Sequence, residues 1–343
     1  MKCSRLDHFA KIETGAVPLT RCCHMANPPR FNTVEEMENS IWLKDITTQL
    51  DNDIWPAQCV RCEQAESAGL DSVRTISNAK HEELKAIHSD YLVVDVVVDT
   101  ICNAACIICS EDLSSTIAKL VNVPVNAFNG LTILETIPRE RIVQLDVLGG
   151  EPGASKRSQY LLQNLADFPN LQRVHISTNG SMRIKEIERL LEKGVKVDLV
   201  ISMDGTKRVF EYCRFPLEWD RFAENMNHYK KLQAQYPNLS LLIWTSISAA
   251  SVADLPNMLA FAKQLDIPLN GAPVQFPEAL SINRSNAVTR RAKQILLDSE
   301  YDFANKIAPL VATDTKDNTE SLQQFLATND AVRKIDYRDY LVP

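Results

Sequence analysis

The chain has 343 residues, enough for one large α/β domain or two smaller ones. Hydrophobic residues make up 45% and charged residues 24%, which is typical of a globular protein with a sizeable core. The net charge of −7 argues against a general nucleic-acid binder, which would normally be basic. No apolar stretch approaches the roughly 20 residues of a membrane span, and the N-terminus lacks the apolar core of a signal peptide. These features predict a cytoplasmic protein with no membrane partner.

From about residue 90 onward, short apolar strands alternate with helical patterns, whereas residues 1–75 show only one clear helical stretch, from Thr33 to about Leu50. Such alternation predicts parallel βαβ units with right-handed crossovers. Six units allow a closed barrel, an open partial barrel or a doubly wound sheet, and periodicity alone does not choose among them. The last thirty residues, to Pro343, predict a helix and a packed tail. The expected strands are 92–98, 142–148, 172–177, 196–202, 240–247 and 267–275, and the expected helices are 113–121, 156–167, 184–193, 217–234, 253–264 and 285–299.

Nine cysteines occur in groups along the chain. In a cytoplasmic protein, such groups indicate metal ligands or buried thiols more readily than disulfides. Cys213 stands alone and is expected to be a small buried hydrophobe. His24 and His175 are also isolated, and we expect them to be packed or solvated. The groups are Cys3, then Cys22 and Cys23, then Cys59 and Cys62, and finally Cys102, Cys106 and Cys109.

The last group has the spacing C-x3-C-x2-C and directly follows the expected strand 92–98. Three thiolates on a short loop can hold three irons of a [4Fe–4S] cube and leave the fourth iron open to a small chelating molecule. A structural zinc knuckle and three buried cysteines are the alternatives. Zinc sites usually have four ligands in two close pairs, and the nearest other cysteines, Cys62 upstream and Cys213 downstream, are not paired locally with the trio. The spacing therefore favours iron–sulfur.

A glycine-rich turn, Leu148-Gly149-Gly150-Glu151-Pro152-Gly153, follows the second expected strand. Two glycines let the backbone turn sharply and approach a ligand without a Cβ in the way. Glu151 then presents a carboxylate at the carboxyl end of a strand, where α/β proteins bind ligands. A tight βα turn is the alternative interpretation. The cysteine trio one strand earlier favours a ligand site.

The trio and the turn together resemble the radical S-adenosylmethionine (radical SAM) enzymes over roughly residues 90–280. The resemblance implies a partial (β/α)6 barrel over 81–280, with the trio holding the [4Fe–4S] cluster that binds S-adenosylmethionine. It also implies that the turn contacts the methionine ammonium of that cofactor. Ser202 and Arg214 are the implied contacts of its carboxylate or ribose, and Ile108, where the family usually has an aromatic residue, is expected to pack on adenine. The full set of implied cofactor-binding residues is Ile108, Gly149, Gly150, Glu151, Pro152, Asn179, Ser202, Asp204 and Arg214; no catalytic residue is implied.

The N-terminal cysteines resemble the twitch/SPASM auxiliary-cluster modules, which usually lie after the barrel. Gly15 and the segment Trp55-Pro56-x-x-Cys59-x-x-Cys62 contribute to this resemblance. It implies a second [4Fe–4S] cluster in a cysteine-rich module at residues 1–80, held by Cys3, Cys22, Cys59 and Cys62, with Cys23 able to replace Cys22. Zinc on the same thiolates and unligated cysteines are the alternatives. Residues 281–343 are expected to form a helical extension at the substrate site.

The function that this resemblance implies is reductive cleavage of S-adenosylmethionine to a 5′-deoxyadenosyl radical, which takes hydrogen from a peptide or protein substrate. The enzyme would then be an oxidoreductase or lyase of ribosomal peptide maturation. Its implied partners are a low-potential electron donor (flavodoxin or ferredoxin) and a separate leader-peptide-binding protein. The alternatives are a radical SAM enzyme that acts on a small metabolite or nucleoside, and a non-catalytic iron–sulfur or zinc scaffold.

Overall fold

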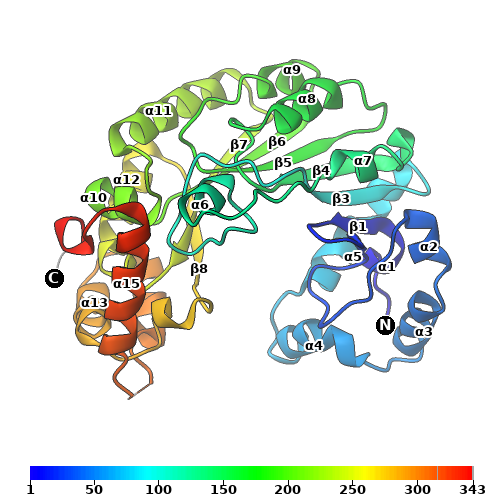
Figure 1. Cartoon of the computed structure of the whole chain (residues 1–343). Helices are drawn as coiled ribbons and strands as arrows, with labels where there is room; N and C mark the ends of the chain where they lie inside the picture. Colours follow the sequence, from blue (N-terminus) through cyan, green and yellow to red (C-terminus); the bar gives the residue numbers. More distant parts are fainter. Residues whose placement is uncertain (315, 342–343) are drawn as a thin grey trace.

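The protein is built on one eight-stranded sheet with the order β2-β1-β3-β4-β5-β6-β7-β8. The structure, a computed structural model, describes residues 1–314 and 316–341. Strand β1 is antiparallel to β2, and every other pair of neighbours is parallel. The sheet curves into an arch, with the N-terminal residues at one end and the C-terminal helices at the other (Figure 1). The strands are β1 (Phe9–Ile12), β2 (Leu19–Thr20), β3 (Leu92–Val97), β4 (Ile142–Leu148), β5 (Arg173–Thr178), β6 (Lys196–Ser202), β7 (Leu239–Ile247) and β8 (Leu269–Pro273).

The predicted α/β class is confirmed, and the six predicted strands are β3 to β8. They follow one another across the sheet in chain order, unlike the strands of a doubly wound sheet. In the described part of the chain, β2 and β8 are free edges, so the sheet does not close on itself. The six predicted helices are also present, as α6 (Ser115–Leu120), α8 (Lys156–Leu165), α9 (Ile187–Glu192), α11 (Trp219–Gln235), α12 (Leu255–Leu265) and α13 (Ala287–Leu297).

The N-terminal residues hold more regular structure than their sequence pattern predicts. The expected helix from Thr33 to Leu50 is divided at Ser40, whose hydroxyl accepts a hydrogen bond from the Leu43 amide and so caps a new helix. Strand β1 extends the main sheet by pairing with β3, which joins this region to the rest of the fold. The helices of the region are α1 (Arg5–His8), α2 (Val34–Asn39), α3 (Ile41–Asp51), α4 (Val60–Ser67) and α5 (Val73–Ile87).

Four further helices complete the described structure: α7 (Leu131–Leu134), α10 (Lys207–Cys213), α14 (Asp302–Ile307) and α15 (Thr319–Arg333). Helix α15 is the helix predicted near the C-terminus, and a short 3-10 turn, Tyr337–Asp339, follows it. Val342 and Pro343, the end of the predicted tail, lie outside the described residues. Among the helices of the described chain, none combines the length and the apolar character needed to cross a bilayer.

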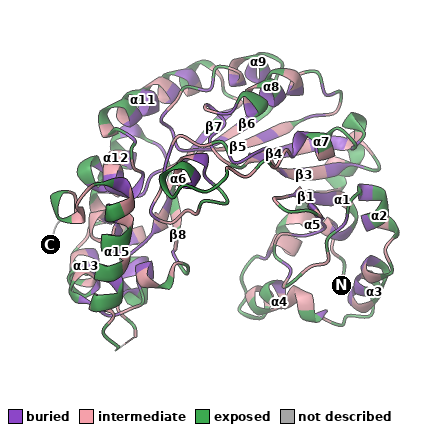
Figure 2. Cartoon of the chain, in the orientation of Figure 1, coloured by how far each residue is buried: buried purple, intermediate pink, exposed green. Residues whose placement is uncertain are grey.

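The two faces of the sheet differ in burial. Side chains alternate along β3 to β6, so that Val94, Val147 and Leu199 are fully buried while their neighbours are partly exposed. The buried face packs against helices α8, α9 and α11, which lie along the outer side of the arch (Figures 1 and 2). We call the opposite, less covered side the open face. On it, the strand register aligns one polar row: Lys11, Asp95, Asp146, His175 and Asp198.

The Asp95–Asp146 pair in this row makes stability depend on pH. Burial, and then the charge of Asp146, raises the pKa of Asp95 to about 7. A carboxyl with a raised folded-state pKa favours the fold at acidic pH, and this contribution is lost as the pH rises through about 7. We therefore expect Asp95→Asn to raise the free energy of unfolding by about 1–3 kcal/mol at pH 8, with little change at pH 4. Urea denaturation at pH 4, 6 and 8 measures this, and an equal effect at pH 4 and pH 8 would contradict it.

Candidate functional site

The cysteine trio lies on the loop that leaves the carboxyl end of β3. Side chains from the start of α6 hold this loop: Ser114 Oγ donates to the Ala104 carbonyl at 2.6 Å, and Thr116 Oγ1 donates to the Cys102 carbonyl at 2.7 Å. Before the trio, the buried Asp99 carboxylate accepts a hydrogen bond of 2.7 Å from Ser155, the N-cap of α8. The loop is thus fixed to the two helices that begin beside it.

The end of α10 and the residues after it also bind the cysteine loop, through backbone hydrogen bonds. The Ala105 amide donates to the Phe215 carbonyl at 2.6 Å, and the Ile107 amide donates to the Cys213 carbonyl at 2.9 Å. Arg214 lies between these two carbonyls in the chain, and its Nη1 approaches Cys106 Sγ at 3.8 Å. The predicted burial of Cys213 is confirmed, since its side chain has no exposed surface. The backbone contacts therefore bring an arginine to the middle cysteine of the trio.

The three thiols of the trio influence one another. Burial raises the pKa of Cys102 to about 12, and the charges of Cys106, Glu151 and Cys109 add to the rise. Burial likewise raises the pKa of Cys109 to about 11, with Cys106 as the next cause. The pKa of Cys106 is also raised by burial, while the charge of Arg214 opposes the rise. Without a cation among them, these thiols stay protonated at neutral pH.

The glycines of the turn after β4 face the cysteine loop. The Gly150 amide donates to the Asp99 carbonyl at 2.9 Å, and the Glu151 amide donates to the Ile101 carbonyl at 2.8 Å. A Cβ on Gly150 would overlap the Ile101 carbonyl, and one on Gly149 would overlap the Asp99 carbonyl. Gly149 also has a φ of +124°. The predicted close approach is therefore found, but its partner is the backbone that leads into the trio.

Glu151 is buried and its carboxylate points into the protein. Its Oε1 accepts hydrogen bonds from Thr178 Oγ1 at 2.7 Å and from the Gly153 amide at 3.1 Å, and its Oε2 accepts one from the Asn179 amide at 2.7 Å. Burial raises the pKa of Glu151, and these three donors oppose the rise. The side chain joins the ends of β4 and β5. Pro152, the next residue, is also buried.

Asn179 links the end of β5 to the cysteine loop. Its Nδ2 donates to Asn103 Oδ1 at 2.9 Å, and Asn103 Nδ2 in turn donates to Ser181 Oγ at 2.9 Å. Asn103 lies between the first two cysteines, and no sequence pattern singles it out. Its sequence signal is weak, because asparagine is common in loops of every kind.

Asp204 and Arg214 form a buried ion pair beside the trio. Arg214 Nη2 lies 2.7 Å from Asp204 Oδ2, and their side chains are 9% and 3% exposed. Asp204 Oδ1 also accepts a hydrogen bond of 2.7 Å from the Ser246 amide. Arg214 Nε is buried without a hydrogen-bond partner among the described residues. Ser202, two residues before Asp204, lies on the open face at the end of β6.

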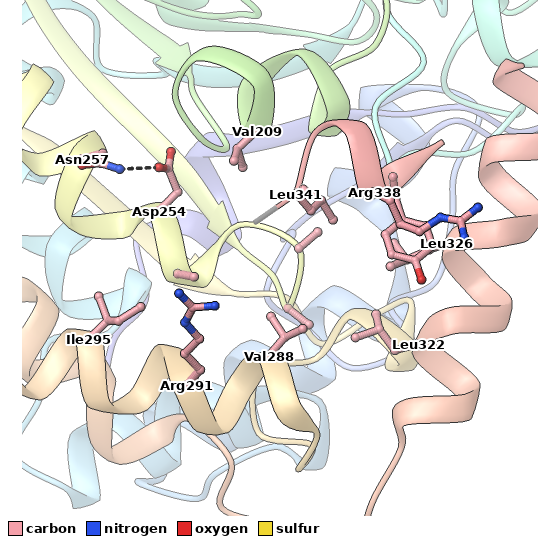
Figure 3. Close-up of a pocket in the computed structure, with 14 residues that line it drawn as sticks. Val209, Asp254, Asn257, Val288, Arg291, Ile295, Leu322, Leu326, Arg338 and Leu341 are labelled. Atoms are coloured by element: carbon pink, nitrogen blue, oxygen red, sulfur yellow. Dashed lines mark hydrogen bonds between the residues drawn. The ribbon is translucent and has the colours of Figure 1, made fainter. Parts of the chain in front are cut away.

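Ile108 packs against an apolar cluster that joins the cysteine loop to the C-terminal helices, with Ile107, Val209 and Leu322 among its members. Val209 and Leu322 of this cluster also line a cavity of about 470 Å³ between α10, α12, α13 and α15 (Figure 3). Its lining is mostly apolar, and its polar end holds Asp254, which accepts a hydrogen bond of 2.7 Å from Asn257. None of the described residues that line this cavity is a cysteine. The extension after residue 280 thus packs on the cysteine loop through α10.

Four of the N-terminal cysteines line one small cavity of about 20 Å³: Cys3, Cys22, Cys59 and Cys62. Burial raises the pKa of Cys3 to about 11 and that of Cys59 to about 12, and neighbouring thiols add to both shifts. Cys23 does not line the cavity. It interacts with Cys22, whose pKa is lowered by a hydrogen bond from Cys23 and by the charge of Arg5. The structure therefore brings together the four preferred ligands of the predicted module and places the alternative one outside.

The two sets of thiols are separate: the trio follows β3, whereas Cys59 and Cys62 of the quartet lie between helices α3 and α5. Within the described residues, no group of three or more His, Cys, Asp and Glu side chains is placed to bind a single metal ion. His24 lines the N-terminal cavity, while His175 lies in the polar row of the open face. The fold and the site thus define an α/β protein with one thiol trio at the carboxyl edge of a parallel sheet and one thiol quartet beside its first strand.

Comparison with known proteins yields distant similarities. No family model matches the chain. Molybdenum cofactor biosynthesis protein 1 of Dictyostelium discoideum is 27% identical over 111 residues, which are 32% of this chain and 18% of that protein. Streptococcus suis SuiB bound to S-adenosylmethionine is 18% identical with a TM-score of 0.39, over 79% of this chain and 64% of that chain. SuiB bound to the precursor peptide SuiA is 17% identical with a TM-score of 0.41, over the same shares. The chain spans less than a fifth of the curated relative and less than two thirds of the SuiB chains.

Proposed function

We propose that this chain is a radical SAM enzyme in which Cys102, Cys106 and Cys109 hold a [4Fe–4S] cluster. The observation that carries the proposal is the position of the trio: three interacting thiols at the carboxyl edge of a parallel sheet, with a buried arginine beside them. In such a cluster each thiolate binds a different iron, so the sulfurs stand around the cube and not around one ion. The unpartnered Arg214 Nε is a donor that suits the negative charge of the thiolate-bound cluster or of a cofactor carboxylate. The three thiols and the nearby guanidinium therefore suit a [4Fe–4S] cluster.

The side chains around the trio would orient this cofactor. When bound, the cluster and S-adenosylmethionine supply reductive cleavage of the sulfonium and a radical that abstracts hydrogen. The carbonyls of Gly149 and Gly150 lie at the edge where the methionine ammonium would bind, and Glu151 and Pro152 would fix the shape of that turn. Ser202 would contact the ribose or carboxylate, and Ile108 the adenine. Asn179, through Asn103, and Asp204, through Arg214, would hold the loop in place.

The proposal includes a second [4Fe–4S] cluster on Cys3, Cys22, Cys59 and Cys62, in a module over residues 1–80. Their shared cavity supports this ligand set over the one with Cys23. The cavity of about 20 Å³ is smaller than a cube, so the thiol side chains must spread to hold one. We assign residues 81–280 to a partial (β/α)6 barrel, because the six strands are sequential and the sheet is open, and residues 281–343 to a C-terminal extension.

For the substrate we propose a peptide or protein, as in the enzymes that the auxiliary-cluster pattern resembles. A low-potential flavodoxin or ferredoxin would deliver the electron, and a separate protein would bind the leader peptide. A small metabolite or nucleoside is the second candidate. It is favoured by the similarity to the Dictyostelium discoideum protein, whose name refers to the biosynthesis of the molybdenum cofactor. The low TM-scores of the SuiB structures do not decide between the two.

The test is formation of 5′-deoxyadenosine by anaerobically reconstituted and reduced protein. We expect the wild type to produce it, Cys106→Ala to lose at least 100-fold of the rate, and the matched Cys213→Ala to keep most of it. Equal yields of 5′-deoxyadenosine from Cys106→Ala and the wild type, or none from a wild type that holds iron, would contradict the proposal. The non-catalytic scaffold would then be the remaining interpretation. Incubation with peptides encoded beside this gene then separates the peptide substrate from the small-molecule one.

A further inference from the structure

A cavity of about 150 Å³ lies between α1, α5 and the open face, and it shares one lining residue, Arg5, with the N-terminal thiol cavity. Val93 and Gln144 contribute its floor from adjacent strands of the sheet, where they are paired in register. The walls come from the N-terminal region, with Ser4 and Arg5 on one side and Ser77 and Lys80 of α5 on the other. It is therefore a pocket between the N-terminal region and the sheet.

The charged side chains that line this cavity are positive. Within the described residues, neither Arg5 nor Lys80 has a carboxylate within 4.0 Å, although the charges of Cys22, Cys23 and Asp95 act on Arg5 from further away. Arg5 lies over the ring of Phe9 at 3.5 Å, and its Nη2 donates to Cys23 Sγ at 3.4 Å. Its Nε is buried and has no hydrogen-bond partner in the described part of the chain. A buried donor without an acceptor is costly, which indicates that an acceptor binds there.

Hydroxyl groups complete a set of donors for an anion. Ser4 is only 8% exposed, and its Oγ has no hydrogen-bond partner among the residues that the structure describes. Ser77 is one turn from Lys80 on the same face of α5, so that both reach the cavity. A guanidinium, an ammonium and two hydroxyls are the groups that bind a carboxylate or a phosphate. Gln144 supplies one further polar group, and its amide nitrogen donates to Asp146 at 2.9 Å.

The register of β3 and β4 places the cavity relative to the sheet edge where the cysteine loop begins. Its floor residues, Val93 and Gln144, precede the strand ends Val97 and Leu148 by four residues, and these ends are also paired in register. At about 3.3 Å per residue, the cavity is about 13 Å from the edge where the cysteine loop begins. A ligand that reaches from one to the other over the open face must be about four extended residues long.

We propose that this cavity binds a carboxylate of the substrate, about four extended residues from the sheet edge where the cysteine loop begins. The anion site is inferred from the side chains that line the cavity. That the anion belongs to the substrate rests on the function proposed above. A chain terminus or an acidic side chain of a peptide supplies such a carboxylate, and an elongated substrate suits the separation better than a compact metabolite.

The test is titration calorimetry of the reduced, cluster-loaded protein without S-adenosylmethionine, with N-acetylglycine as the carboxylate probe and N-acetylglycinamide as its neutral match. We expect binding of the carboxylate alone, weakened at least tenfold by Lys80→Gln and by Arg5→Gln and unchanged by Lys85→Gln, a control on the same helix. Because Arg5 also contacts Cys23, the Lys80 variant is the decisive one; circular dichroism confirms its fold.

Equal affinity for the two probes, or an affinity that Lys80→Gln leaves unchanged, would overturn the anion site. Tighter binding of inorganic phosphate than of N-acetylglycine would overturn its assignment to a carboxylate. If the calorimetry agrees but no 5′-deoxyadenosine is formed, the anion site stands and the enzymatic function fails. If 5′-deoxyadenosine is formed without probe binding, the function stands and this inference fails.

Discussion

Gly150→Ala is expected to lower the free energy of unfolding by about 3 kcal/mol and to release iron from the trio. A Cβ at this position would occupy the space of the Ile101 carbonyl, so either the turn or the cysteine loop must move. Both responses break the hydrogen bonds from Gly150 and Glu151 to the backbone of the loop. Chemical denaturation gives the stability, and iron quantification after reconstitution gives the cluster content.

The matched control is Gly194→Ala. Gly194 has a φ of +81°, and no described atom beyond its chain neighbours lies within 4 Å of the position that a Cβ would take, so alanine there costs only the backbone strain, about 1 kcal/mol. At Gly150 the loss of stability would come instead from the overlap of the new Cβ with the Ile101 carbonyl. A Gly150→Ala protein that is as stable as the control and retains all of its iron would show that the turn does not support the loop.

Arg214→Gln has the second large expected effect, a loss of about 3–5 kcal/mol of stability. The substitution leaves the Asp204 carboxylate buried without its charge partner, and this residue is only 2% exposed. The double variant Asp204→Asn/Arg214→Gln removes both charges, and we expect it to regain at least half of that loss. Urea denaturation of the two variants and the wild type measures the difference.

An exposed ion pair provides the comparison. Arg189 and Asp167 lie 2.8 Å apart, but their side chains are 49% and 52% exposed, so solvent screens the pair. Arg189→Gln should cost less than about 1 kcal/mol. Equal losses for Arg214→Gln and Arg189→Gln would mean that water reaches the Asp204 carboxylate, and the trio would then lie in a wetter site than the burial indicates.

The sequence was sufficient to predict the six strands from residue 90 onward and the helices between them, because short apolar segments alternate there with longer helical patterns. The short helices α7, α10 and α14 were not predicted. The sequence also placed the trio, the glycine turn and Asp204 at the same edge, since the carboxyl ends of parallel strands meet there. The position of β1 was not predictable in this way. Four residues, Phe9–Ile12, are too short for a clear pattern, and their pairing with β3 depends on contacts between segments that are far apart in the chain.

The roles of single side chains were harder to predict than their positions. The sequence predicts that Glu151 presents its carboxylate to a ligand, yet this carboxylate is surrounded by three donors that come partly from the next strand. The choice between Cys22 and Cys23 depends on which of two adjacent side chains points into the cavity. Arg5 carried no motif at all, and its interest comes from an unpartnered Nε that only the folded structure shows.

The proposed function requires two separate clusters, one of which is held by the trio. Anaerobic iron quantification of the reconstituted wild type, of the triple variant Cys102→Ala/Cys106→Ala/Cys109→Ala and of the double variant Cys59→Ala/Cys62→Ala tests it most directly. We predict about eight irons per chain in the wild type and about four in each variant. Zinc in place of iron, or a triple variant that keeps all of its iron, would contradict the proposed function.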